Sequence, residues 1–147
     1  MTEDESRSRF AAARVARLAT ADSLGRPHVV PVTFDAQDNS IVIAIDHKPK
    51  RTLNLRRLRN IRGNPQVSLL VDHYEEEWRA LWWVRADGIA RVLEAGAEWQ
   101  RGLDRLRCKY PKYQEVPPTG PAILIDVFKW SGWSYREAIT FARDGAN

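Results

Sequence analysis

Short apolar runs rich in β-branched residues recur along the chain, and turn residues separate them. Runs of this kind, bounded by Gly, Pro, Asn or Asp, indicate β-strands. The expected strands are residues 17–20, 28–34, 40–45, 66–71, 78–84 with a continuation over 86–93, and 122–129. The first connections are too short for crossover helices, so these strands are expected to pair antiparallel. The pattern predicts an α+β fold, mainly β, built on a small antiparallel barrel of about six strands.

Three segments carry the three- and four-residue spacing of helices: about residues 8–18, 52–62 and 94–110. In the second, Thr52 is a candidate N-cap and Gly-Asn-Pro at 63–65 ends the helix. Its apolar residues fall on one stripe, and its arginines fall on the other side.

The remaining segments are expected to be turns, loops or ends. They are the hairpin loop 35–40, the polar loop 72–77, the proline-rich loop 112–121, a WSGW turn at 130–133, and polar, flexible ends at about 1–9 and 137–147. Pro31 inside an expected strand indicates an edge strand or a bulge, because proline donates no ladder hydrogen bond.

Length and composition add few constraints. A chain of 147 residues suits a single domain over 1–147. The lone Cys108 excludes an internal disulfide and a multi-cysteine metal site. Because the N-terminus is acidic, with no apolar signal region behind it, and no apolar stretch approaches the ~20 residues of a membrane span, we expect a soluble cytoplasmic protein.

Positive charge is concentrated in one place. The segment 47–62 holds seven Lys and Arg and no acid; since the whole chain carries +4, the rest sums to −3. Nucleic-acid binders usually have a broader basic surface, so this confinement favours a small polyanion. Cations at a strand end followed by a helix N-terminus can bind a phosphate. A solvated helix face explains the charge alone equally well.

Other candidate chemistry is sparse. The chain has no GxSxG, no Walker loop and no GxGxxG. An Asp-His pair follows each of two expected strands, at His47 and His73, but this is a weak zinc pattern, so no metal is expected. The six tryptophans are more informative. Trp82 and Trp83 adjoin on a strand, so one of them is expected on the face opposite the core, where it can form a cofactor wall or a subunit interface.

The order of these motifs resembles the pyridoxamine 5'-phosphate oxidase-like split β-barrel family, and within it the deazaflavin (F420)-dependent branch. The resemblance rests on RLATADSLGRPHVVPVTF, on IVIAID followed by the basic helix, on RNIRGNPQVSLLVD, and on LWWVRADG and WSGW, and it spans about residues 14–133. It implies a six-stranded split barrel (the FMN-binding split barrel) that forms a homodimer, with two cofactor sites at the subunit interface.

The resemblance also implies which residues contact the cofactor. The ring system is expected along Pro31, Val32 and Thr33 and along the strand that ends at Ile45 and Asp46. Phosphate contacts are expected from Lys48, Lys50, Arg51, Arg57 and Asn60, and aromatic contacts from Trp82 and Trp133.

The implied activity is hydride transfer from reduced F420 to an unidentified small or planar unsaturated substrate, and no side chain is identified as catalytic. FMN is the alternative cofactor, because both cofactors share a ribityl phosphate. A third interpretation is a non-catalytic module that binds a cofactor or haem, with His28, His47 and His73 as the candidate imidazoles.

Overall fold

The computed structural model describes residues 1–45 and 51–144, with the backbone alone for 51–55 and 140–144. Its elements are α1 (Glu3–Ala12), β1 (Ala16–Ala21), β2 (Pro27–Val32), β3 (Asp35–Gln37), β4 (Ser40–Ala44), α2 (Arg51–Gly63), β5 (Gln66–His73), the 3-10 helix η1 (Trp78–Ala80), β6 (Trp82–Leu93), α3 (Ala97–Lys109), α4 (Lys112–Glu115), β7 (Ala122–Ser134) and α5 (Tyr135–Asp144). None of the described helices is both long enough and apolar enough to span a bilayer.

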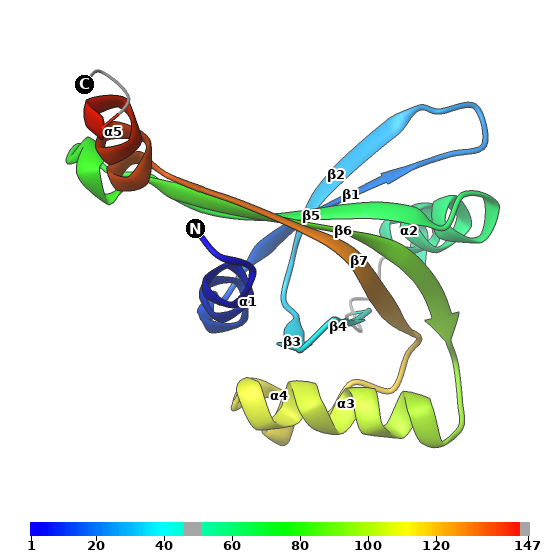
Figure 1. Ribbon diagram of the computed structural model, residues 1–147. Helices are drawn as coiled ribbons and strands as arrows, with labels where there is room; N and C mark the ends of the chain where they lie inside the picture. The colour runs from blue at the N-terminus through cyan, green and yellow to red at the C-terminus, as the bar shows by residue number, and fades with distance from the viewer. Residues whose placement is uncertain (46–50, 145–147) are drawn as a thin grey trace.

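The strands form one sheet in the order β2-β1-β5-β6-β7-β4-β3, with antiparallel pairs throughout. Figure 1 shows β5, β6 and β7 crossing the molecule side by side, with the β1–β2 hairpin and the β3–β4 pair diverging from them. The predicted α+β class with an antiparallel sheet and flanking helices is confirmed. The sheet has seven strands where about six were expected, because β3 forms inside the segment predicted as a hairpin loop.

Strand β4 is buried on both faces, which explains its unbroken apolar run. Ile41, Ile43 and Ile45 belong to the main core enclosed by the sheet. Val42 and Ala44 belong to a second cluster, beneath α3. A strand covered on both sides has no solvent face, so its sequence does not alternate.

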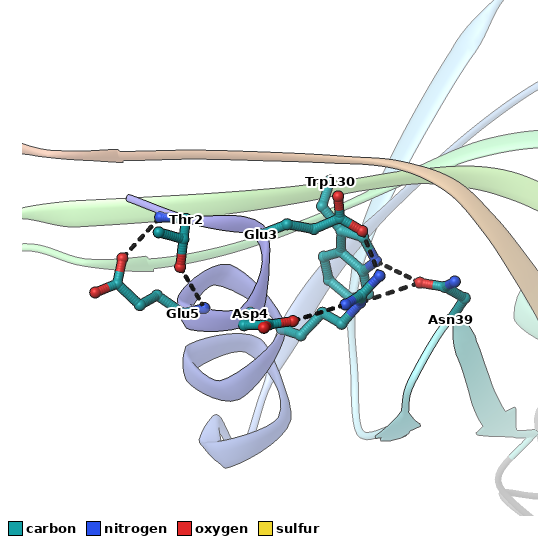
Figure 2. Close-up of polar contacts among 7 residues, drawn as sticks. Thr2, Glu3, Asp4, Glu5, Asn39 and Trp130 are labelled. Atoms are coloured by element: carbon teal, nitrogen blue, oxygen red, sulfur yellow. Dashed lines mark hydrogen bonds and ion pairs between the residues drawn. The ribbon is translucent and has the colours of Figure 1, made fainter.

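The first helix begins and ends earlier than the sequence pattern indicated. It covers Glu3–Ala12 instead of about 8–18, so residues 3–9 are helical where a flexible end was expected. Thr2 starts it with a capping box: its hydroxyl accepts from the Glu5 amide (3.1 Å), and the Glu5 carboxylate accepts from the Thr2 amide (2.7 Å; Figure 2). Residues 17 and 18 instead pair with both β2 and β5, so tertiary pairing outweighs the local helical pattern.

Helix α1 is held on the sheet by Phe10 and by a polar contact beside it. Phe10 is fully buried, with ring centroids 4.9 Å from Phe34 and 5.3 Å from Trp130. The Asn39 side-chain oxygen accepts from Trp130 Nε1 (2.9 Å), as Figure 2 shows. It also accepts from Arg7 Nε (3.1 Å). Trp130 is thus a packing residue of the main core.

The segment around WSGW is strand, not turn. Strand β7 runs to Ser134, and its register with β6 continues through Trp83↔Trp133 and Trp82↔Ser134. Strand β6 supplies ladder partners along this whole length, and this pairing keeps the chain extended through Gly132. The tail that follows, expected to be a polar, flexible end from about residue 137, forms helix α5 instead.

Three further boundaries differ from the prediction. Helix α2 begins at Arg51, so Thr52 lies inside it and is not its N-cap. Trp78 lies in η1, and β6 begins only at Trp82. Residues 112–115 form α4 within the expected loop, because the prolines that exclude regular structure follow it at 117 and 118.

Candidate functional site

A cleft opens between the end of β2, strand β4 and helix α2. Its volume is about 190 Å³, and its lining residues are Val15, Pro31, Val32, Thr33, Ala44 and Arg57. Pro31, Val32, Thr33 and Arg57 were all expected at a cofactor site, so the structure brings together four residues that lie up to 26 positions apart. The described lining thus combines apolar side chains with the Thr33 hydroxyl and the Arg57 guanidinium.

Strand β2 provides the wall because it is an edge strand. It is the first strand in the sheet order and pairs with β1 alone, with Arg17↔Pro31 and Ala16↔Val32 in register. Pro31 was predicted to mark an edge, and this is confirmed. In the described part of the chain the other edge of β2 has no strand neighbour.

Helix α2 provides the charge. Leu58 and Ile61 are 5% and 2% exposed and face the core, as their spacing predicted. Arg57, on the other side of the helix, therefore reaches the cleft. The pKa of His28 on β2 lies below its usual value because burial disfavours the charged imidazole and because Arg56 and Arg57 repel it. This part of the molecule is thus electropositive and suited to an anion.

Asn60, also expected at the phosphate, lies elsewhere. It is 5% exposed, and its amide donates to Thr20 Oγ1 at 3.1 Å, which ties α2 to β1. Asn60 borders a second hollow of about 640 Å³, lined by Asp22, Ser23, Arg26, Arg56, Arg59, Asn60 and Gly63. Arg57 of α2 therefore lines the cleft, whereas Arg56 and Arg59 line this hollow.

The other expected contacts next to the basic segment are not in the cleft lining. Ile45 is 5% exposed in the main core, and its amide donates to the Pro121 carbonyl at 3.1 Å. Arg51 is described only by its backbone, as the first residue of α2. Asp46, Lys48 and Lys50 lie outside the described residues.

Trp82 and Trp133 lie at the far end of the β6–β7 pair, next to α5 and away from α2 (Figure 1). Trp82 stacks on His73, with centroids 6.3 Å apart, and carries the Arg9 guanidinium 5.2 Å above its ring. Trp133 packs edge-on against Tyr135. Within one described chain these aromatic residues do not line the cleft.

Two tyrosines behind the cleft were missed. Tyr113 of α4 lies 2.7 Å from Thr33, hydroxyl to hydroxyl. The Tyr110 hydroxyl accepts from the Phe34 amide (3.1 Å) and lies 2.9 Å from the carbonyl oxygens of both Phe34 and Arg14. Nothing in the local sequence indicates that residues 80 positions apart meet, so these contacts were not predictable from spacing.

Comparisons with known proteins agree with this architecture. The family model described as pyridoxamine 5'-phosphate oxidase matches residues 2–134. Among curated proteins, no sequence matches the chain. Solved structures do: an FAD-binding protein of Mesorhizobium loti is 22% identical with a TM-score of 0.70, covering 90% of this chain and 94% of that one. The haem storage protein HutZ of Vibrio cholerae is 21% identical with a TM-score of 0.65, covering 89% and 90%. At these identities the similarity concerns the fold.

Proposed function

The chain belongs to the pyridoxamine 5'-phosphate oxidase family, and on this premise we propose that the cleft between β2 and α2 binds a flavin-type cofactor through its phosphate and ring. The observation that carries the proposal is the juxtaposition of Arg57 with Pro31, Val32 and Thr33. A guanidinium binds phosphate by charge-assisted hydrogen bonds, and an apolar wall with a hydroxyl suits the flat ring. The residues present therefore fit such a group.

The cofactor we propose is F420, with FMN as the alternative. Both present a ribityl phosphate to Arg57, so this residue does not distinguish them. Among the described residues, the second hollow is lined by Arg26, Arg56 and Arg59 and by the Asp22 carboxylate. The surplus positive charge suits the longer anionic tail of F420 better than FMN, which ends at its phosphate.

When bound, the reduced cofactor supplies a hydride for a small or planar unsaturated substrate. This chain contributes binding and orientation: Arg57 holds the anionic group and the β2 edge supports the ring. The electropositive surroundings also favour negative charge that develops on the bound molecule. We therefore propose an F420-dependent reductase.

Binding titrations test this proposal. Wild-type protein is titrated separately with F420 and with FMN, and quenching of tryptophan fluorescence gives each dissociation constant. We expect F420 to bind, and Arg57→Gln to weaken binding about 10-fold or more, as for a lost charge-assisted hydrogen bond. Arg62→Gln is the matched control, because Arg62 lies on the same helix and pairs with Glu94 (2.7 Å) outside the cleft. Tight FMN binding without F420 binding overturns the choice of cofactor, and binding of neither overturns the function.

The cleft also supports the proposal of a homodimer. Ligand pockets usually measure ~300–1,000 Å³, and the cleft of one chain measures about 190 Å³. A second wall is therefore needed, and the aromatic end of a partner's β6–β7 pair, with Trp82 and Trp133, is our candidate. Subunit complementation tests this. Arg57→Gln and Trp133→Leu homodimers are each expected to bind the cofactor poorly, whereas mixed dimers formed from the two by subunit exchange should each contain one intact site. Absence of restoration in confirmed mixed dimers contradicts a shared site.

Haem binding is the second candidate function. His28 Nδ1 is buried and has no hydrogen-bond partner among the described residues. Its lowered pKa keeps the imidazole neutral, which is the form that binds iron. Haemin added to wild type and to His28→Ala distinguishes this function: a Soret shift that the substitution abolishes favours haem, and an unchanged haemin spectrum excludes His28 as a ligand.

A further inference from the structure

Among the described residues that line the cleft, Thr33 alone has a side-chain hydroxyl, and this hydroxyl has a partner behind the wall. Tyr113 OH lies 2.7 Å from Thr33 Oγ1, in a half-buried position. Among the described residues, Tyr113 is the only side chain that hydrogen-bonds to this threonine. The state of the Thr33 hydroxyl is therefore set by Tyr113.

The chemistry of the two hydroxyls favours one direction for their shared proton. A phenol, with a pKa near 10, is a stronger acid than an aliphatic alcohol and hence the better donor. We therefore assign Tyr113 as the donor and Thr33 as the acceptor. The threonine proton is then available to a second acceptor, and a hydroxyl that already accepts a hydrogen bond is polarised into a better donor.

From this geometry we propose that Tyr113 is a positioning residue for the cleft, one that fixes Thr33 as a hydrogen-bond donor to a bound ring. The ligand recognised is a planar heteroaromatic molecule with a carbonyl oxygen or an unprotonated ring nitrogen at the edge that faces Thr33. This inference rests on the proposed function, because it assumes that the ring lies along the β2 wall.

The support for Tyr113 does not depend on its hydroxyl. Its ring packs edge-on against Tyr110 with centroids 5.6 Å apart. Tyr110 hydrogen-bonds to the backbone of Phe34 and of Arg14. Phe34 follows Thr33 and Arg14 precedes Val15, and Thr33 and Val15 both line the cleft. Tyr110 thus holds the backbone next to Thr33 and Val15, and Tyr113 contacts the Thr33 side chain.

Three variants test the proposal without deleting a side chain from the core. Tyr113→Phe removes only the phenol oxygen, Thr33→Val removes the threonine hydroxyl at nearly constant shape, and Thr33→Ser keeps the hydroxyl. Tyr74→Phe is the matched control, since Tyr74 is 71% exposed and lies beyond the end of β5. Thermal unfolding of each variant verifies that the fold is retained.

The first readout is the dissociation constant of whichever cofactor, F420 or FMN, the wild type binds. We expect Thr33→Val and Tyr113→Phe each to weaken binding about 2- to 10-fold, the range for one neutral hydrogen bond. The double variant should be no weaker than Thr33→Val alone, because both changes remove the same interaction. The second readout is the visible absorption band of the bound cofactor, which should shift in Tyr113→Phe but not in Tyr74→Phe.

The outcomes separate this inference from the proposed function. Binding by wild type with unchanged constants and spectra in Tyr113→Phe and Thr33→Val overturns the positioning role alone. Additive losses in the double variant also overturn it, because they mean that the two hydroxyls act independently. Binding of neither cofactor by the wild type overturns the proposed function, and the inference with it.

Discussion

Gly88 provides a direct test of the sheet geometry that supports the cleft. It lies in β6 where the register with β7 shifts between Asp87 and Gly88. A Cβ built on Gly88 would lie 2.6 Å from the Asp126 carbonyl oxygen and 2.7 Å from Ile125 Cγ2. Close approach of two strands at a bulge is one of the positions that require glycine. We predict that Gly88→Ala destabilises the protein substantially.

The magnitude follows from what the methyl group meets. Restoring an ordinary 3.4 Å contact to the Asp126 oxygen requires a movement of about 0.8 Å. The obstacle is backbone, and the neighbouring Ile125 is fully buried, so neither yields by a simple rotamer change. Overpacking costs about 1–3 kcal/mol, and a weakened ladder hydrogen bond adds about 1 kcal/mol. We expect a loss of about 2–4 kcal/mol in the free energy of unfolding, or about 6–12 °C in Tm.

Urea unfolding followed by tryptophan fluorescence measures this loss, at one fixed protein concentration for all variants. Gly63→Ala is the matched control, because the nearest atom to its Cβ is Ser23 Cβ at 4.0 Å. Gly63 is the last residue of α2, where alanine is tolerated or gains up to ~1 kcal/mol. A Gly88→Ala protein within ~0.5 kcal/mol of wild type, or no less stable than Gly63→Ala, would refute the reasoning on the close strand contact.

Three further predictions address burial and charge. Phe10→Ala should cost about 3–5 kcal/mol in urea unfolding, since Phe10 is 0% exposed between α1 and the sheet; a loss below 1 kcal/mol would mean that α1 is not docked. Burial lowers the pKa of Lys109 to about 8, so between pH 8 and about 9.5 the unfolded chain binds more protons than the folded one, and stability should rise with pH. Lys109→Met should abolish this rise, and a pH profile of stability identical to that of wild type would contradict the lowered pKa of Lys109. The measured pH range ends below pH 10 because burial also raises the pKa of Tyr110. The pKa of His28, measured by NMR, should increase in Arg57→Gln and on phosphate binding to wild type, because each removes or neutralises a repelling charge; no change would mean that the guanidinium does not act on this imidazole.

The sequence predicted best those features that a short stretch of chain determines. The apolar stripe of α2 predicted that Leu58 and Ile61 face the core, and Pro31 predicted an edge strand. Both follow from the geometry of one element, by helical periodicity or by a missing amide hydrogen. The concentration of charge on α2 likewise predicted an anion site, and Arg57 lines an electropositive cleft beside that edge.

Predictions failed where tertiary pairing decides between local alternatives. Residues 17 and 18 were assigned both to a helix over 8–18 and to a strand over 17–20, and their strand partners on both sides in β1 leave only the strand correct. The WSGW segment contains glycine and serine, which favour turns, but β6 provides a ladder partner as far as Ser134. Such partners are distant in sequence, so no window of a few residues reveals them.

The proposed site residues show how far such reasoning reaches. Pro31, Val32, Thr33 and Arg57 come together because the end of the edge strand β2 and helix α2 border the same cleft. Trp82 and Trp133 were selected for their chemistry, yet they lie at the opposite end of a long sheet. A flat ligand in a cleft of about 190 Å³ leaves a ring face uncovered, and Trp82 and Trp133, at the other end of the β6–β7 pair, are only partly buried. If the cleft residues and the two tryptophans bind one cofactor, a second copy of the chain must bring them together. The homodimer and the assignment of Trp82 and Trp133 to the cofactor site are therefore one hypothesis, which a single test can refute.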